Sequence, residues 1–299
     1  MVGVFCVREI KMPIKNVEND LYINFFNHAY NFLLERTNRV ITEEEIKQTY
    51  LKPIELASKD ISMKKIYRNM LFSAQNKQRR SNNTIGGKIG GFDNLSKVLG
   101  NFDHNYVLEH FTDYMQIIDE VRENLPLKAP IVISENDPNK SLWPQFSNTC
   151  VSAARFLTNF KDAKDFICWA ETFQKDERSI EGLPLILSAE IYGFGFPLAC
   201  DFLKELGFEN YGKPDVHIKD IFRAYKFIDE LDSKTNTNES NCRVFKKMLE
   251  ISKSIGISCY TLDKVIWLIG SGDFYLNENI RKISMKKDFM AMADRFLAQ

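Results

Sequence analysis

Residues 183–222 read LPLILSAEIYGFGFPLACDFLKELGFENYGKPDVHIKDIF, and they predict two helices joined by a tight turn. Apolar residues three and four positions apart mark the first helix: Leu183, Ile186, Leu187 and Ile191. This is the spacing of one buried helical face. A similar stripe marks the second helix: Leu198, Ala199, Phe202, Leu203 and Leu206. The segment therefore predicts a helical hairpin.

The turn of this hairpin is Tyr192-Gly193-Phe194-Gly195-Phe196. Two glycines one residue apart permit positive backbone angles that other residues resist. Pro197 suits the first turn of the second helix, where its missing amide donor costs nothing. We expect the amides around Gly195 to bind one phosphate oxygen, helped by the helix dipole. An ordinary helical hairpin with a glycine turn is the alternative.

A third helix follows a break in the pattern. Gly207, Gly212 and Pro214 interrupt the second helix, and the sequence Lys213-Pro214-Asp215-Val216-His217 then opens the next. Asp is a favourable residue at a helix N-cap, so capping is the simplest role for Asp215. The apolar face of this helix comprises Ile218, Ile221, Phe222 and Tyr225.

Together these features resemble the helix-hairpin-helix DNA glycosylases, a superfamily that includes endonuclease III and the adenine, 8-oxoguanine and alkylpurine glycosylases. In that family a Gly-hydrophobic-Gly hairpin is followed, about twenty residues later, by an Asp in a Val-Asp-x-His context. Pro214-Asp215-Val216-His217 is similar to it. The resemblance implies an all-α fold of two lobes around a DNA-binding cleft. It also implies that Asp215 is the catalytic carboxylate, which a helix N-cap can be at the same time. We expect His217 to pack or cap beside it, in a supporting role.

A second match lies upstream, at Leu71-Phe72-Ser73-Ala74-Gln75. It resembles the Leu-Leu-Ser-Ala-Gln segment of the endonuclease III branch, where the glutamine ends a helix and wedges into the duplex beside the extruded base. The resemblance implies that Gln75 contacts DNA, with the basic Arg79 and Arg80 directly after it. The alternative is that Gln75 is a solvated residue at a helix end.

The sequence departs from the family at Pro197. Bifunctional members carry a lysine at this point, which attacks the sugar to form a Schiff base. Its absence predicts a monofunctional glycosylase that uses water. Lys213 is more simply explained as a phosphate contact, but a bifunctional glycosylase/AP lyase that uses Lys213 remains an alternative. So does a non-catalytic DNA-binding or sensor protein.

The expected partner is double-stranded DNA with a damaged or modified base, bound by a monomer. The sequence does not identify the base. The residues expected to contact DNA come from the two matched segments and the basic positions beside them: Gln75, Arg79, Arg80, Gly193, Gly195, Phe196 and Lys213.

Composition limits how such a protein can bind DNA. Of the 299 residues, 44% are hydrophobic, enough for a sizeable core. Lys plus Arg and Asp plus Glu number 40 each, so the formal net charge is zero. DNA contacts must therefore come from local basic patches rather than a diffuse positive field. No segment reaches the length of a membrane span, so no membrane partner is expected.

The cysteines give no metal pattern. None of the six lies within four residues of another, which predicts neither a zinc site nor an iron–sulfur cluster. We therefore expect no metal or cofactor. Buried reduced thiols in a cytoplasmic protein, nucleoid-associated in a prokaryote, are the simplest interpretation.

The domain expectation follows from the resemblance. Residues 64–212 should form a central helical lobe that contains the hairpin at 183–206. Residues 1–63 should pack with residues 213–299, the lobe that opens with Asp215. Thr42 and Glu45 predict a capping box, and 260–267 a buried helix. The polar run 232–241 predicts a mobile loop. Further helices are expected over residues 63–78, 94–99, 105–123, 149–160 and 163–175.

Overall fold

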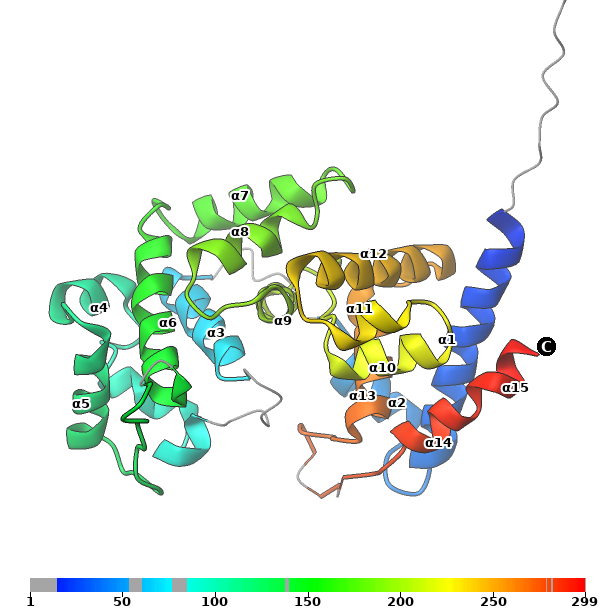
Figure 1. Cartoon of the computed structure of the whole chain (residues 1–299), viewed down its shortest axis with the longest axis horizontal. Coiled ribbons are helices and arrows are strands. Elements are labelled where there is room, and N and C mark those ends of the chain that lie inside the picture. The colour runs from blue at the N-terminus through cyan, green and yellow to red at the C-terminus, as the bar shows by residue number, and fades with distance from the viewer. Residues whose placement is uncertain are drawn as a thin grey trace, which may run out of the picture.

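The computed structural model describes residues 15–53, 61–76, 85–137, 140–277, 279–280 and 282–298. Every regular element in these ranges is helical, which confirms the expected all-α fold (Figure 1). In the same ranges no helix is long and apolar enough to cross a bilayer.

In chain order the α-helices are α1 Lys15–Thr37, α2 Glu43–Ile46, α3 Met63–Ala74, α4 His104–His110, α5 Tyr114–Asn124, α6 Leu142–Leu157, α7 Ala163–Gln174, α8 Gly182–Glu190, α9 Phe196–Leu206, α10 Val216–Ala224, α11 Glu230–Lys234, α12 Asn238–Ile255, α13 Cys259–Ser271, α14 Lys286–Ala291 and α15 Ala293–Leu297. A π-helical turn covers Lys47–Leu51, and 3-10 turns cover Gly86–Ile89 and Phe92–Lys97. The predicted capping box is confirmed: Thr42 and Glu45 exchange backbone and side-chain hydrogen bonds at the start of α2.

Helix α13 is the core of one end of the molecule. It packs against α1, α10, α12 and α14 (Figure 1), and nearly all of its residues are buried. The prediction of a buried helix over residues 260–267 is therefore confirmed. An aromatic cluster closes this end, because the buried ring of Phe25 on α1 contacts Phe222 of α10, Phe227 after it, and Phe289 and Phe296 near the C-terminus.

The other end is built on α6, which packs against α3, α4, α5 and α8 (Figure 1). Helix α9 lies between the two ends and contacts α3, α8 and α12. We keep as a proposal that residues 64–212 form one lobe and residues 1–63 with 213–299 the other. The packing of α1 on α12 and α13 supports it.

Some helix boundaries differ from expectation. The single helix expected over 105–123 is two helices, because Phe111–Asp113 leave the helix and Asp113 caps α5 in a capping box with Gln116. Helix α6 begins at Leu142 rather than Thr149, since Pro144 lies in its first turn, where no amide donor is needed. The helix expected over 94–99 is the 3-10 turn Phe92–Lys97.

The prediction of a mobile loop over residues 232–241 is wrong. Most of this run lies in α11 and the first turn of α12, capped by Asp229 and Thr237. Asp232 is buried and bound through both carboxylate oxygens to Arg243. Polar composition did not reveal these partners, which fix the segment against α12.

Candidate active site

The helical hairpin forms as expected, with α8 and α9 joined through residues 191–195. Gly193 has a φ of 69°, the left-handed conformation that favours glycine. Gly195 has a φ of −64°, so it does not use the positive backbone angles that glycine permits. Two hydroxyls of α6 anchor the turn: Thr149 donates to the Tyr192 carbonyl at 2.8 Å, and Ser152 accepts from the Tyr192 amide at 2.9 Å.

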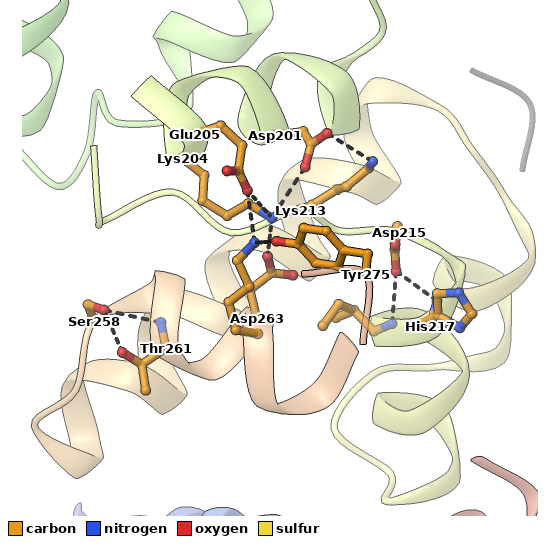
Figure 2. A network of polar contacts seen from close by, with 12 residues as sticks. Asp201, Lys204, Glu205, Lys213, Asp215, His217, Ser258, Thr261, Asp263 and Tyr275 are labelled. Carbon is orange, nitrogen blue, oxygen red and sulfur yellow. Dashed lines mark hydrogen bonds and ion pairs between the residues drawn. The ribbon is translucent and has the colours of Figure 1, made fainter. Parts of the chain in front are cut away.

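Asp215 is the N-cap of α10, as the sequence predicts. Its Oδ1 accepts hydrogen bonds from the amides of His217 at 2.8 Å and Ile218 at 3.2 Å (Figure 2). The capping bonds use only Oδ1, and no donor among the described residues binds Oδ2. One oxygen therefore fixes the carboxylate while the other can act on a ligand.

Asp215 lines a cavity of about 720 Å³ that also contains the hairpin glycines. Distant segments contribute to its wall. They are Asn76 after α3, Gly193, Gly195, Pro197 and Leu198 of the hairpin, residues 213–217 with Lys219, residues 233–236, and Trp267, Ser271, Asp273 and Lys282. A group bound to the hairpin amides would thus border the same cavity as the Asp215 carboxylate.

Lys213 lines the cavity, and its ammonium forms an ion pair with a buried network of charged side chains (Figure 2). Its Nζ lies 3.2 Å from Asp201 on α9, and Asp201 also pairs with Lys204 at 3.2 Å. Lys204 in turn pairs with Asp263 of α13 at 2.6 Å. Burial raises the pKa of an isolated carboxyl, but Lys213 and Lys204 hold the pKa of Asp201 well below its usual range.

Sequence reasoning missed this network. Asp201 and Lys204 sit on an otherwise apolar helix, and charged side chains there are normally solvated. The network extends to Lys264, whose Nζ donates to Glu205 at 2.9 Å and to the Tyr275 hydroxyl at 3.0 Å (Figure 2). It ties α9 to α13, two helices that both contribute residues to the cavity wall.

His217 packs beside Asp215 in the place expected of a supporting residue. Its ring lies edge-on to Trp267, with centroids 6.5 Å apart. A Cβ at Gly270 would lie 2.5 Å from His217 Cβ, so only glycine leaves room for this ring. Burial lowers the pKa of His217, and its buried Nδ1 has no hydrogen-bond partner among the described residues.

The chain was compared with known proteins. No protein-family model matches the chain. An 8-oxoguanine DNA glycosylase/AP lyase of Thermoplasma volcanium is 28% identical over 150 residues, 48% of this chain and 67% of the relative. A protein of the same name from Korarchaeum cryptofilum is 30% identical over 86 residues, 29% of this chain and 41% of the relative.

Two solved structures share the fold. One is a Methanocaldococcus jannaschii 8-oxoguanine glycosylase/lyase in complex with a 15-mer DNA containing 8-oxoguanine, with a TM-score of 0.51 at 16% identity over 80% of this chain and 95% of that one. The other is an 8-oxoguanine DNA glycosylase of the same organism, with a TM-score of 0.54 at 15% identity over 84% and 98%. The chain therefore shares the fold of archaeal 8-oxoguanine DNA glycosylases and is similar to such enzymes in sequence over part of its length.

Two of the DNA contacts that the glycosylase resemblance implies are contradicted by burial. Phe196 is fully buried and packs edge-on against Phe245 of α12, so it belongs to the core rather than to the DNA surface. Gln75 is also fully buried, and its Oε1 accepts from the Gly86 amide at 3.2 Å. It is neither a wedge nor a solvated helix end; its neighbour Asn76 lines the cavity instead.

The remaining contacts divide into two groups. Gly193, Gly195 and Lys213 line the cavity with Asp215. Arg79 and Arg80 lie outside the described residues. Sequence reasoning also missed residues 233–236 and Lys219 as cavity wall, because nothing in the local pattern of α11 shows that it borders the same cavity as Asp215.

Proposed function

We propose that this protein is a DNA glycosylase that extrudes one damaged or modified base from double-stranded DNA and hydrolyses its N-glycosidic bond. The observation that carries the proposal is the position of Asp215, held on one oxygen in the wall of the cavity that the hairpin glycines also line. The base must leave the helical stack because stacking hides the bond to be cut. A cavity of about 720 Å³ has room for an extruded nucleotide.

Asp215 would act mainly through its charge. Positive charge develops on the deoxyribose as the base leaves, and a carboxylate about 4 Å away is worth roughly 4 kcal/mol at an effective dielectric near 20. That stabilisation corresponds to roughly a thousandfold in rate. The Oδ2 atom, which takes no part in capping, can also orient or deprotonate the attacking water.

The presence of Pro197 favours hydrolysis by water over catalysis by an amine. It occupies the position where bifunctional members carry their lysine, and a proline ring offers no amine. A second candidate has its own support: Lys213 lines the cavity, and the archaeal relatives are named as AP lyases as well as glycosylases. The ion pair of Lys213 with Asp201 favours a charged phosphate contact over a free nucleophile.

The test is a panel of duplex oligonucleotides that each carry one altered base, beginning with 8-oxoguanine because the relatives carry that name. Abasic sites are scored by strand breakage after hot alkali. We expect excision of at least one altered base and none from undamaged DNA. Tight duplex binding without excision of any base would instead support a non-catalytic sensor.

A further inference from the structure

Lys219 is a further charged residue of the cavity, and it lies one helical turn after Asp215. Residues four apart share a face of a helix, and both side chains line the same cavity. Lys219 is 4% exposed, unusual for a lysine. The mechanism proposed above gives it no task.

Two hydrogen bonds of Lys219 Nζ leave one of its N–H donors without an acceptor among the described residues. Its Nζ donates to the Thr235 carbonyl and to Asn241 Oδ1, each at 2.7 Å, and neither acceptor is charged. An ammonium has three N–H donors, and no third acceptor lies within hydrogen-bonding distance in the described part of the chain. Burial lowers the pKa of Lys219, but Asp232 and Asp215 oppose the shift.

Two acceptors of the wall beside Lys219, residues 233–236, are occupied from within. Lys219 donates to the Thr235 carbonyl at 2.7 Å, and Ser240 donates to the same carbonyl at 3.4 Å. Asn241 Nδ2 donates to Asn236 Oδ1 at 3.2 Å, which leaves the exposed amide donors of Asn236 for the cavity. This wall therefore offers donors to a ligand, and its internal bonds hold them in place.

The cavity is also poorly suited to a cationic base. Four lysines line it (213, 219, 234 and 282), against the carboxylates of Asp215 and Asp273. Binding of a cation is favoured by aromatic faces, but Trp267 is the only aromatic side chain among the described lining residues. Its ring is partly engaged, edge-on to Tyr275 at 5.5 Å.

We propose that Lys219, with Asn236, is a specificity-determining residue that donates hydrogen bonds to carbonyl oxygens of the extruded base. The site then selects neutral bases with a carbonyl-rich edge and rejects cationic alkylated purines. This inference rests on the proposed glycosylase function, because it assigns the extruded base to the cavity that Asp215 lines.

The test compares Lys219→Met with Lys253→Met. Lys253 is exposed on α12, pairs with Glu177 and does not line the cavity, so its variant removes an equal charge without removing the buried donor. Single-turnover excision is measured on duplexes carrying 8-oxoguanine or uracil, and on one carrying 7-methylguanine. We expect Lys219→Met to lower the ratio of carbonyl-rich to cationic base excision by about tenfold or more. Lys253→Met should leave this ratio unchanged.

Asn236→Ala provides a second variant that does not disturb the buried lysine, and it should shift the ratio in the same direction. Thermal unfolding and binding to undamaged duplex check that each variant is folded. A ratio unchanged in both Lys219→Met and Asn236→Ala overturns the inference alone, as does a wild-type protein that prefers 7-methylguanine. A wild-type protein that excises neither these bases nor any other altered base of the panel overturns the proposed function, and the inference with it.

Discussion

Asp215 combines a structural and a chemical role in one side chain. As the N-cap of α10 it satisfies two backbone amides through Oδ1, which costs it one oxygen but fixes the direction of the other. A carboxylate held in this way needs little reorganisation when charge develops on the sugar. The helix N-terminus thus supplies the positioning that catalysis requires.

Replacing Asp215 with Asn separates the two roles. Asn caps helices about as well as Asp, so we expect the thermal unfolding midpoint to change little. Excision should fall about a thousandfold because the charge is lost. Binding to duplex DNA should persist or tighten, since a negative charge facing phosphates is removed. Normal single-turnover excision by the variant would show that another group carries the chemistry.

Burial explains which residue roles the sequence could and could not predict. The capping geometry of Asp215 depends on local sequence and was predictable. The burial of Phe196 and Gln75 was not predictable, because a short motif does not show which distant residues will cover these side chains. Phe245, which packs on Phe196, lies in α12, far along the chain. The Gly86 amide, which donates to the Gln75 side chain, lies eleven residues further along the chain, and no sequence pattern links the two positions.

At the scale of elements, the turn of the hairpin contributes two glycines to the cavity wall, next to Pro197 and Leu198 of α9. A Cβ at Gly195 would meet only Pro197 Cδ, at 3.9 Å, and its φ of −64° suits any residue. Glycine is therefore not needed there for folding. Its value is the open space in front of the amides, where a phosphate can approach.

Gly195→Ala should accordingly keep its stability but lose DNA affinity. Phosphate contacts carry no base information, so the loss should be similar across duplex sequences. Gly193→Ala is the contrasting variant, since its φ of 69° makes the left-handed conformation cost about 1–2 kcal/mol of stability. The measurements are urea unfolding and fluorescence-anisotropy titration. Unchanged affinity in Gly195→Ala would remove the hairpin from the interface.

The buried charges between α9 and α13 make a second prediction at this scale. Lys204 is the partner that Asp263 depends on, and both side chains are buried. Lys204→Met should destabilise the fold by about 3–5 kcal/mol, because it leaves an uncompensated buried carboxylate. The double variant Lys204→Met/Asp263→Leu should recover much of that loss. Lys47→Met, which breaks an exposed pair with Glu43, serves as the control in urea unfolding. A single variant as stable as the wild type would show that water reaches Asp263.

For the whole molecule, the sequence predicts the class of fold but not the cavity. Helical periodicity predicts an all-α fold, and the hairpin with Asp215 resembles the motif of DNA glycosylases. The cavity wall combines Asn76, the hairpin, residues 213–217 with Lys219, residues 233–236, and the end of α13. Their meeting is a property of tertiary packing and leaves no local pattern. The polar run at 232–241 shows this most clearly, since it reads as a loop and forms a fixed wall.

The chemistry of the whole protein depends on whether the cavity holds a nucleophilic amine. With Pro197 at the family's lysine position and Lys213 paired to Asp201, we expect a water-using enzyme that leaves intact abasic sites. Little strand cleavage should occur at neutral pH, and borohydride should trap no covalent adduct on the excised substrate.

Lys213→Ala separates the two mechanisms. If Lys213 binds phosphate, the variant should bind DNA more weakly and lose about one unit of the salt-dependence slope. Its product should remain an intact abasic site, because the water reaction does not use the amine. If Lys213 is the nucleophile, the wild type should give a trapped adduct and nick the strand unaided. Both signals should then vanish in Lys213→Ala. That pair of results would replace hydrolysis with amine catalysis, as the lyase names of the archaeal relatives suggest.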